Sequence, residues 1–126
     1  MIHERHFTLE EANSLLGQIE PMLHKLREAR DRLTDSEAHE ALAGAAPANG
    51  GGEHGRGVGE AFLEVRRLLG ELVGLGIVVR DVDSGLIDFP AIRDEREVYL
   101  CWRFGEDEVG FWHDLDAGFG GREPLD

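Results

Sequence analysis

The hydrophobic residues of this chain change their spacing once, at residue 77. Before that point they recur every three or four positions, which is the repeat of one face of an α-helix. After it they alternate, which is the repeat of a half-buried strand. The order of these patterns predicts an α+β fold, with a long antiparallel helical hairpin followed by a small antiparallel sheet of three or four strands.

The first predicted helix covers residues 8–43. Thr8 and Glu11 have the spacing of a capping box, in which each side chain accepts a hydrogen bond from the other residue's amide. Pro21 removes one backbone donor inside the helix, so we expect a bend beside it rather than a break. Arg30 occupies the one position of the coiled-coil-like stripe that is not apolar. The apolar members of the stripe are Leu9, Ala12, Leu16, Ile19, Leu23, Leu26 and Leu33.

A second, shorter helix is expected over residues 59–75, after a flexible glycine-rich loop at residues 44–58. At 1.5 Å per residue the two helices are about 50 Å and about 25 Å long, so the second cannot cover all of the first. The N-terminal part of the long stripe must then be buried against the sheet or against a second chain. The spacing of the second helix predicts a matching stripe, formed by Phe62, Val65, Leu69 and Leu72.

The sheet is expected over residues 77–115, with a turn-rich tail at 116–126, and the whole chain is expected to form one domain. A hairpin opens the sheet, and its second strand, LIDF, is expected to end at Pro90 because proline lacks a donor. The clearest strand covers residues 97–104, and the segment VGFWHDL predicts the strand that follows it.

The register between the last two strands decides which side chains meet. If the turn pairs Phe104 with Glu108, Tyr99 faces His113, and Cys101 lies on the same face in a diagonal relation to His113. A slip of one residue moves His113 to the opposite face. The turn sequence GEDE leaves both registers open.

Charge and composition exclude several classes of function. The chain has 26 acidic and 13 basic side chains, a net charge of −13, so its mean field repels nucleic acids and anionic membrane surfaces. The polar start and the lack of a long apolar run predict a cytoplasmic protein with no membrane span. The single cysteine excludes an intramolecular disulfide and a multi-cysteine metal site within one chain.

The aromatic C-terminal half contains the candidate metal ligands. His113 would supply a nitrogen, Asp88, Glu106 or Asp114 the carboxylates, and Cys101 a thiolate, a mixture that suits a divalent metal such as zinc or iron. The same residues admit a second interpretation, in which His113 activates Cys101 as a nucleophile. A position in the middle of a strand does not favour that interpretation, because an apolar environment raises the pKa of a thiol.

A second set of candidates would bind a small molecule. Trp102 and Trp112 could flank a planar or cationic ligand, and Tyr99 adds a third aromatic ring. The segment GFGGREPL could wrap a phosphate or carboxylate with backbone amides and the guanidinium of Arg122. The alternatives are that the tryptophans are core residues and that Arg122 pairs with an acidic neighbour.

Five segments occur in the order FTLEEAN, GLIDFP, VYLCWRFGE, WHDLDAGF and GREPL. In this the chain resembles a small bacterial family known only as a domain of unknown function. The resemblance covers nearly the whole chain and implies an intact fold and a bacterial cytoplasmic origin, but no reaction. Because the first predicted helix is too long for the second to cover and has an apolar stripe, we expect an interaction or ligand-binding protein rather than an enzyme, acting as a homodimer or with a protein partner through its helical hairpin. The alternative is a metal-binding protein.

Overall fold

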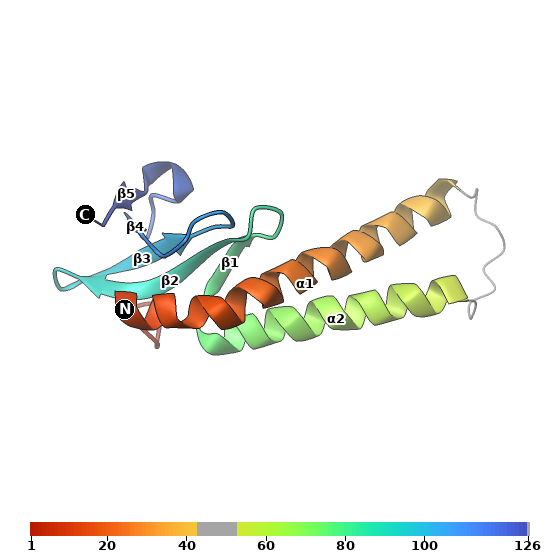
Figure 1. The fold of residues 1–126 in the computed structure, drawn as a ribbon, viewed down its shortest axis with the longest axis horizontal. Helices are drawn as coiled ribbons and strands as arrows, with labels where there is room; N and C mark the ends of the chain where they lie inside the picture. The colour runs from red at the N-terminus through yellow and green to blue at the C-terminus, as the bar shows by residue number, and fades with distance from the viewer. Residues whose placement is uncertain (43–52, 126) are drawn as a thin grey trace.

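The computed structural model describes residues 1–42 and 53–125. In this part of the chain two helices, α1 (Leu9–Leu42) and α2 (Glu53–Leu75), precede five strands that form one antiparallel sheet. Figure 1 shows the hairpin as a long arm, with the sheet beside the start of α1 and the end of α2. The predicted α+β class is confirmed, whereas the bounds of the helices and the number of strands differ from the prediction.

Helix α1 begins as its sequence predicts. The amide of Thr8 donates to Glu11 Oε1 at 3.0 Å, and the amide of Glu11 donates to Thr8 Oγ1 at 3.1 Å, which completes the capping box. Pro21 lies inside the helix without ending it. Its ring would crowd the carbonyl of the residue four positions earlier, which is the exposed Gly17. In Figure 1 the first turns of α1 follow the sheet and the later turns rise away from it, in agreement with the expected bend.

Helix α2 begins at Glu53, earlier than the predicted residue 59, so residues 53–58 of the predicted loop are helical. Residues 44–52 of that loop, and residue 43 of the first predicted helix, lie outside the described part. Its buried face differs from the predicted stripe, because Phe62 is 54% exposed while Ala61 is fully buried. Val65 and Leu69 are half-buried. The buried face is therefore rotated by about one residue from the predicted stripe. Its members are Ala61, Leu68 and Leu72.

The five described strands follow one another in the sheet in chain order. The fifth lies in the predicted tail, so the expectation of three or four strands was too low. It is only two residues long and has no room for an alternating pattern. The strands are β1 (Val78–Asp81), β2 (Leu86–Arg93), β3 (Arg96–Trp102), β4 (Phe111–Asp114) and β5 (Glu123–Pro124).

The prediction that Pro90 ends its strand is wrong. Pro90 lies inside β2 and pairs with Tyr99 of β3. Its carbonyl accepts from the amide of Phe7 at 2.7 Å, so the nitrogen and oxygen of Pro90 face the N-terminal segment and not β3. Because β1 pairs only with Leu86–Asp88, the missing donor costs no ladder bond.

One face of the sheet covers the start of α1. On this face Ile87, Phe89 and Trp102 are at most 1% exposed and belong to the same core as Ala12, Leu16 and Ile19. The N-terminal part of the apolar stripe of α1 therefore packs on the sheet of its own chain. Two members of the predicted stripe lie outside this core, because Leu9 is 42% exposed and Leu33 is only half-buried.

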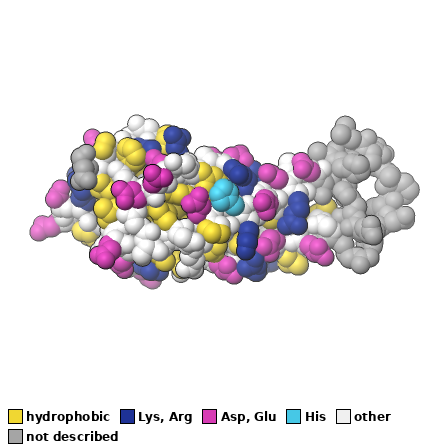
Figure 2. All heavy atoms as spheres, viewed as in Figure 1, with side chains coloured by type: hydrophobic (Ala, Val, Ile, Leu, Met, Phe, Trp, Pro, Cys, Tyr) yellow, Lys and Arg dark blue, Asp and Glu magenta, His cyan; other side chains and the backbone are white. Residues whose placement is uncertain are grey.

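No helix among the described residues is long and apolar enough to cross a membrane. Figure 2 shows acidic and basic side chains interspersed along the hairpin on the face in view.

Candidate functional site

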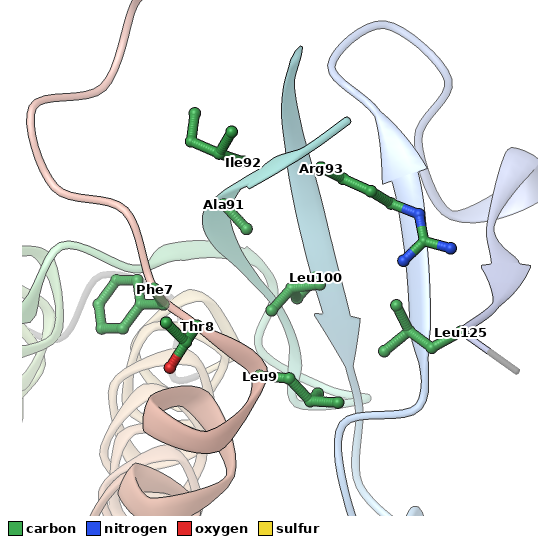
Figure 3. A pocket seen from close by; sticks show the side chains of 8 residues that line it. All are labelled: Phe7, Thr8, Leu9, Ala91, Ile92, Arg93, Leu100 and Leu125. Atoms are coloured by element: carbon green, nitrogen blue, oxygen red, sulfur yellow. The ribbon is translucent and has the colours of Figure 1, made fainter. Parts of the chain in front are cut away.

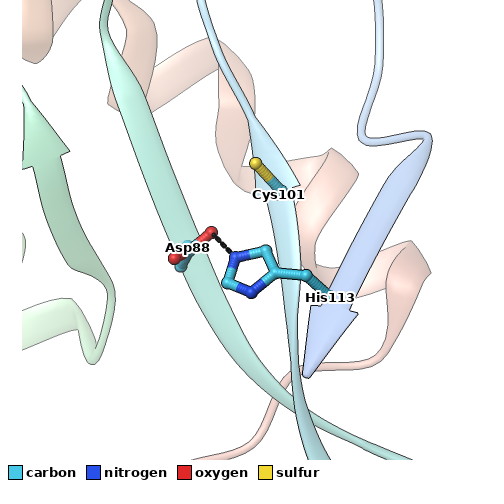
Figure 4. A group of neighbouring side chains, drawn as sticks. All are labelled: Asp88, Cys101 and His113. Carbon is cyan, nitrogen blue, oxygen red and sulfur yellow. Dashed lines mark hydrogen bonds and ion pairs between the residues drawn. The ribbon is translucent and has the colours of Figure 1, made fainter. Parts of the chain in front are cut away.

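Three side chains meet on the sheet face that points away from the helices. Asp88 comes from β2, Cys101 from β3 and His113 from β4, and each is at most 2% exposed. One potential ligand atom from each lies within 4.8 Å of the others (Figure 4). Alternation puts them on this face because their neighbours along the strands pack against the helices.

The register that brings these side chains together is one of the two that the turn sequence leaves open. Tyr99 pairs with His113, and Cys101 pairs with Phe111, so the thiol and the imidazole share a face. Asp88 is the partner of Cys101 on the other side of β3. The cluster therefore spans three adjacent strands, with Cys101 on the central one.

Both ring nitrogens of His113 contact oxygen atoms. Nδ1 lies 2.7 Å from the carbonyl oxygen of Asp114, and Nε2 lies 3.0 Å from Asp88 Oδ1. A carbonyl oxygen only accepts, so Nδ1 carries a hydrogen. Nε2 is then the nitrogen that faces the carboxyl of Asp88. A backbone carbonyl on the far nitrogen is also the arrangement that orients metal-binding histidines.

Two arginine side chains lie at the edges of the cluster. Arg80 Nε donates to Asp88 Oδ2 at 2.9 Å, and its guanidinium lies 4.9 Å from the centre of the Tyr99 ring. Arg122 lies 3.7 Å from the sulfur of Cys101. Burial raises the pKa of the Cys101 thiol to about 11, against the lowering effect of Arg122. The thiol is therefore protonated at neutral pH, which does not favour Cys101 as a nucleophile.

The N-terminal segment closes one side of this face. The carboxylate of Glu97 accepts from the amides of Ile2 and His3 and contacts His6 Nε2 at 2.7 Å. Burial raises the pKa of Glu97, but the hydrogen bonds from His6 and the two amides outweigh burial and lower it to about 2. His3 Nε2 lies 2.7 Å from the hydroxyl of Tyr99.

Of the five candidate metal ligands, two lie apart from the cluster of Asp88, Cys101 and His113. The Asp114 carboxylate pairs with Arg96 at 3.0 Å. The other is Glu106. Its carboxylate forms a bidentate ion pair with Arg122, at 3.1 Å and 2.5 Å. Glu106 follows β3 in a turn, where strand alternation gives no guide to direction. Its backbone carbonyl accepts from Trp102 Nε1 at 3.0 Å.

The four predicted ligand-binding residues lie on two faces. Trp102 is 1% exposed in the core beneath the helices, and Trp112 packs against the same core. Tyr99 lies on the opposite face, where Arg80 is positioned over its ring. Arg122 contacts the sulfur of Cys101 on that same face. The sheet therefore separates the two tryptophans from Tyr99 and Arg122.

Sequence reasoning missed Arg80 and the two N-terminal histidines. Arg80 lies where the β1–β2 register shifts, between Val79 and Asp81, and such an irregularity changes where a side chain points. His3 and His6 contact residues more than ninety positions away. No local pattern reports pairings of this kind.

The fold and this cluster define a small α+β protein with a buried Asp–Cys–His centre on one face of its sheet. The chain belongs to the family described as "Uncharacterized conserved protein (DUF2203)", whose model matches residues 5–125. This confirms the expected membership of an uncharacterised family. No curated protein and no solved structure matches the chain.

Proposed function

We propose that this protein binds one divalent, thiophilic metal ion, with zinc the best fit, through Asp88, Cys101 and His113. The observation that carries the proposal is that these three side chains each offer an atom within 4.8 Å of the others. Imidazole nitrogen, thiolate and carboxylate are all ordinary zinc ligands, and soft sulfur favours zinc over magnesium or calcium.

The surroundings support a preformed site. The Nδ1 hydrogen of His113 is bound by the Asp114 carbonyl, which leaves Nε2 as the atom that faces the cluster. All three strands that carry the ligands are paired on both sides, so the backbone holds the three positions fixed. Metal binding would displace the proton of the Cys101 thiol.

Cobalt titration tests the proposal and reports the ligand type. Tag-free protein is titrated with Co²⁺, and an intense near-ultraviolet charge-transfer band is expected because the thiolate binds the ion directly. Cys101→Ser should abolish the band, whereas His24→Gln should keep it, since His24 is a half-buried histidine of α1 outside the cluster. Absence of the band, or its survival in Cys101→Ser, would contradict the proposal.

A second candidate function is homo-oligomer formation through the helical hairpin. The stripe of α1 packs on the sheet, so the argument for a second chain now depends on α2. Phe62, Leu63 and Val73 of α2 are 54%, 63% and 65% exposed. Such apolar exposure on one helix favours a partner surface.

Light scattering coupled to size exclusion tests this assembly. A dimer is expected for the unmodified protein and a monomer for Phe62→Glu with Val73→Glu. Phe119→Glu is the control, because Phe119 is also exposed, at 40%, but lies near the C-terminus. A monomeric unmodified protein would contradict this second function.

A further inference from the structure

The sheet face beneath the helices is not fully covered at its end beyond the start of α1. A pocket of about 250 Å³ lies there, between the N-terminal segment, the end of β2 and the C-terminal segment (Figure 3). It lies on the face opposite to the Asp–Cys–His centre, because Leu100 and Ala91, which line it, belong to the core under the helices. It is therefore separate from the proposed metal site.

The lining of the pocket is mostly apolar, and two of its members, Leu9 and Ile92, are more than 40% exposed. Thr8 also lines it, but its hydroxyl oxygen accepts the Glu11 amide in the helix cap. The apolar lining residues are Phe7, Leu9, Ala91, Ile92, Leu100 and Leu125. An apolar site with a few placed polar groups is the usual form of a small-molecule site.

Arg93 is the charged residue of this lining. Its guanidinium carbon lies 5.0 Å from the centre of the Trp112 ring, so one face of the group is held by the aromatic surface. Figure 3 shows the side chain extending from the end of β2 towards Leu125. Among the side chains that the structure describes, Arg93 has no ion-pair or hydrogen-bond partner, whereas the neighbouring Arg96 pairs with Asp114 at 3.0 Å.

We propose that this pocket binds a small amphiphilic monocarboxylate, with its apolar chain against Leu100 and Leu9 and its carboxylate on Arg93. A planar guanidinium fixed on a ring presents its edge donors to a carboxylate in the bidentate geometry that arginine prefers. The volume limits the ligand, because 250 Å³ corresponds to about eight groups of the size that water takes in the liquid. A chain of about six carbons with a carboxylate has this size.

The test uses hexanoate and hexanol as a matched pair of probes, followed by amide chemical shifts of the ¹⁵N-labelled protein. Hexanoate should shift the amides of Ala91, Leu100 and Leu125 in a saturable manner, and hexanol should bind at least about tenfold more weakly, because it lacks the charge. Equal binding of the two probes, or no saturable shift, would overturn the proposal.

A pair of arginine variants separates the role of Arg93 from a general charge effect. Arg93→Gln should weaken hexanoate binding about tenfold, the loss expected for a charge-assisted hydrogen bond. Arg103→Gln removes the same charge from an arginine that lies 5.0 Å from the Phe119 ring centre, and it should leave binding unchanged. Equal weakening by both variants would overturn the assignment of Arg93. Shifts of the same amides on raising the protein concentration, without a probe, would overturn it as well, because a second copy would then be the occupant.

Discussion

Asp88 and His113 lie on strands that are not neighbours, yet their side chains meet across β3 with His113 Nε2 3.0 Å from Asp88 Oδ1. Both residues are 2% exposed. A buried pair of this kind needs both partners, because removing one leaves an uncompensated polar or charged group. The strand between them contributes Cys101, so the same geometry that stabilises the pair also assembles the candidate metal ligands.

The first prediction concerns the stability of this pair in metal-free protein. Asp88→Leu and His113→Leu should each lower the free energy of unfolding by about 3–5 kcal/mol, because each leaves one buried polar atom, His113 Nε2 or Asp88 Oδ1, without the group that it contacts. The double variant should cost less than the sum, since neither polar group remains. Urea unfolding in the presence of a chelator measures all three. Additive losses would show that the two side chains do not interact.

The second prediction concerns the acid stability of the docked N-terminal segment. The pKa of Glu97 is lowered from 4.5 to about 2, so the folded state binds this proton less readily than the unfolded state. Its contribution is therefore fully present above pH 4.5, decreases as the pH falls towards 2, and is lost below that. Thermal unfolding of the protein and of Glu97→Gln over this range should give a difference that shrinks with falling pH. A difference independent of pH would contradict the role of Glu97.

The third prediction concerns the turn between β2 and β3. Asp94 and Glu95 have φ values of 51° and 64°, as in the type I′ turn of two-residue hairpins. Because a side chain with a positive φ costs about 1 kcal/mol or more relative to glycine, Glu95→Gly should raise the free energy of unfolding by about 1 kcal/mol. Glu10→Gly, in the first turn of α1, should lower it instead, through the poor helix propensity of glycine. Denaturant unfolding compares the two, and a loss of stability in Glu95→Gly would refute the turn assignment.

The fourth prediction concerns Gly85, which lies under the ring of Phe104. Its φ is 65°, and a Cβ placed there would lie 2.6 Å from the ring. Gly85→Ala should therefore lower the free energy of unfolding by about 1–3 kcal/mol, through backbone strain and displacement of the ring. Gly110→Ala is the matched control, because a Cβ at that position meets no atom within 4 Å. Similar losses in the two variants would contradict the close contact.

Local patterns predicted the parts of the fold that depend on local physics. The Thr8–Glu11 cap, the passage of α1 through Pro21 and the change of period at residue 77 each follow from neighbouring residues. Strand alternation also allowed Cys101 and His113 to share a face, in one of two registers. The choice between those registers is made by packing on both faces of the sheet, which a four-residue turn does not encode.

The errors share a physical origin in contacts between distant segments. Pro90 lies inside β2 with its carbonyl towards Phe7, a residue far away in sequence whose amide donates a hydrogen bond to it. Glu106 was grouped with the metal ligands, but Arg122 binds its carboxylate. Phe62 is exposed, whereas the neighbouring Ala61 is fully buried. Each outcome depends on the assembled fold, where tertiary contacts override the local pattern.

Native mass spectrometry of tag-free protein, combined with elemental analysis of the same sample, tests the central claim most directly. We predict one zinc ion per chain, retained in His24→Gln and lost in both Cys101→Ser and His113→Ala. Loss of the ion in the two cluster variants, with circular dichroism unchanged in at least Cys101→Ser, would assign the ion to the cluster. A folded protein that contains no metal and takes up none from added zinc would contradict the account, as would a metal ion that remains bound in both cluster variants.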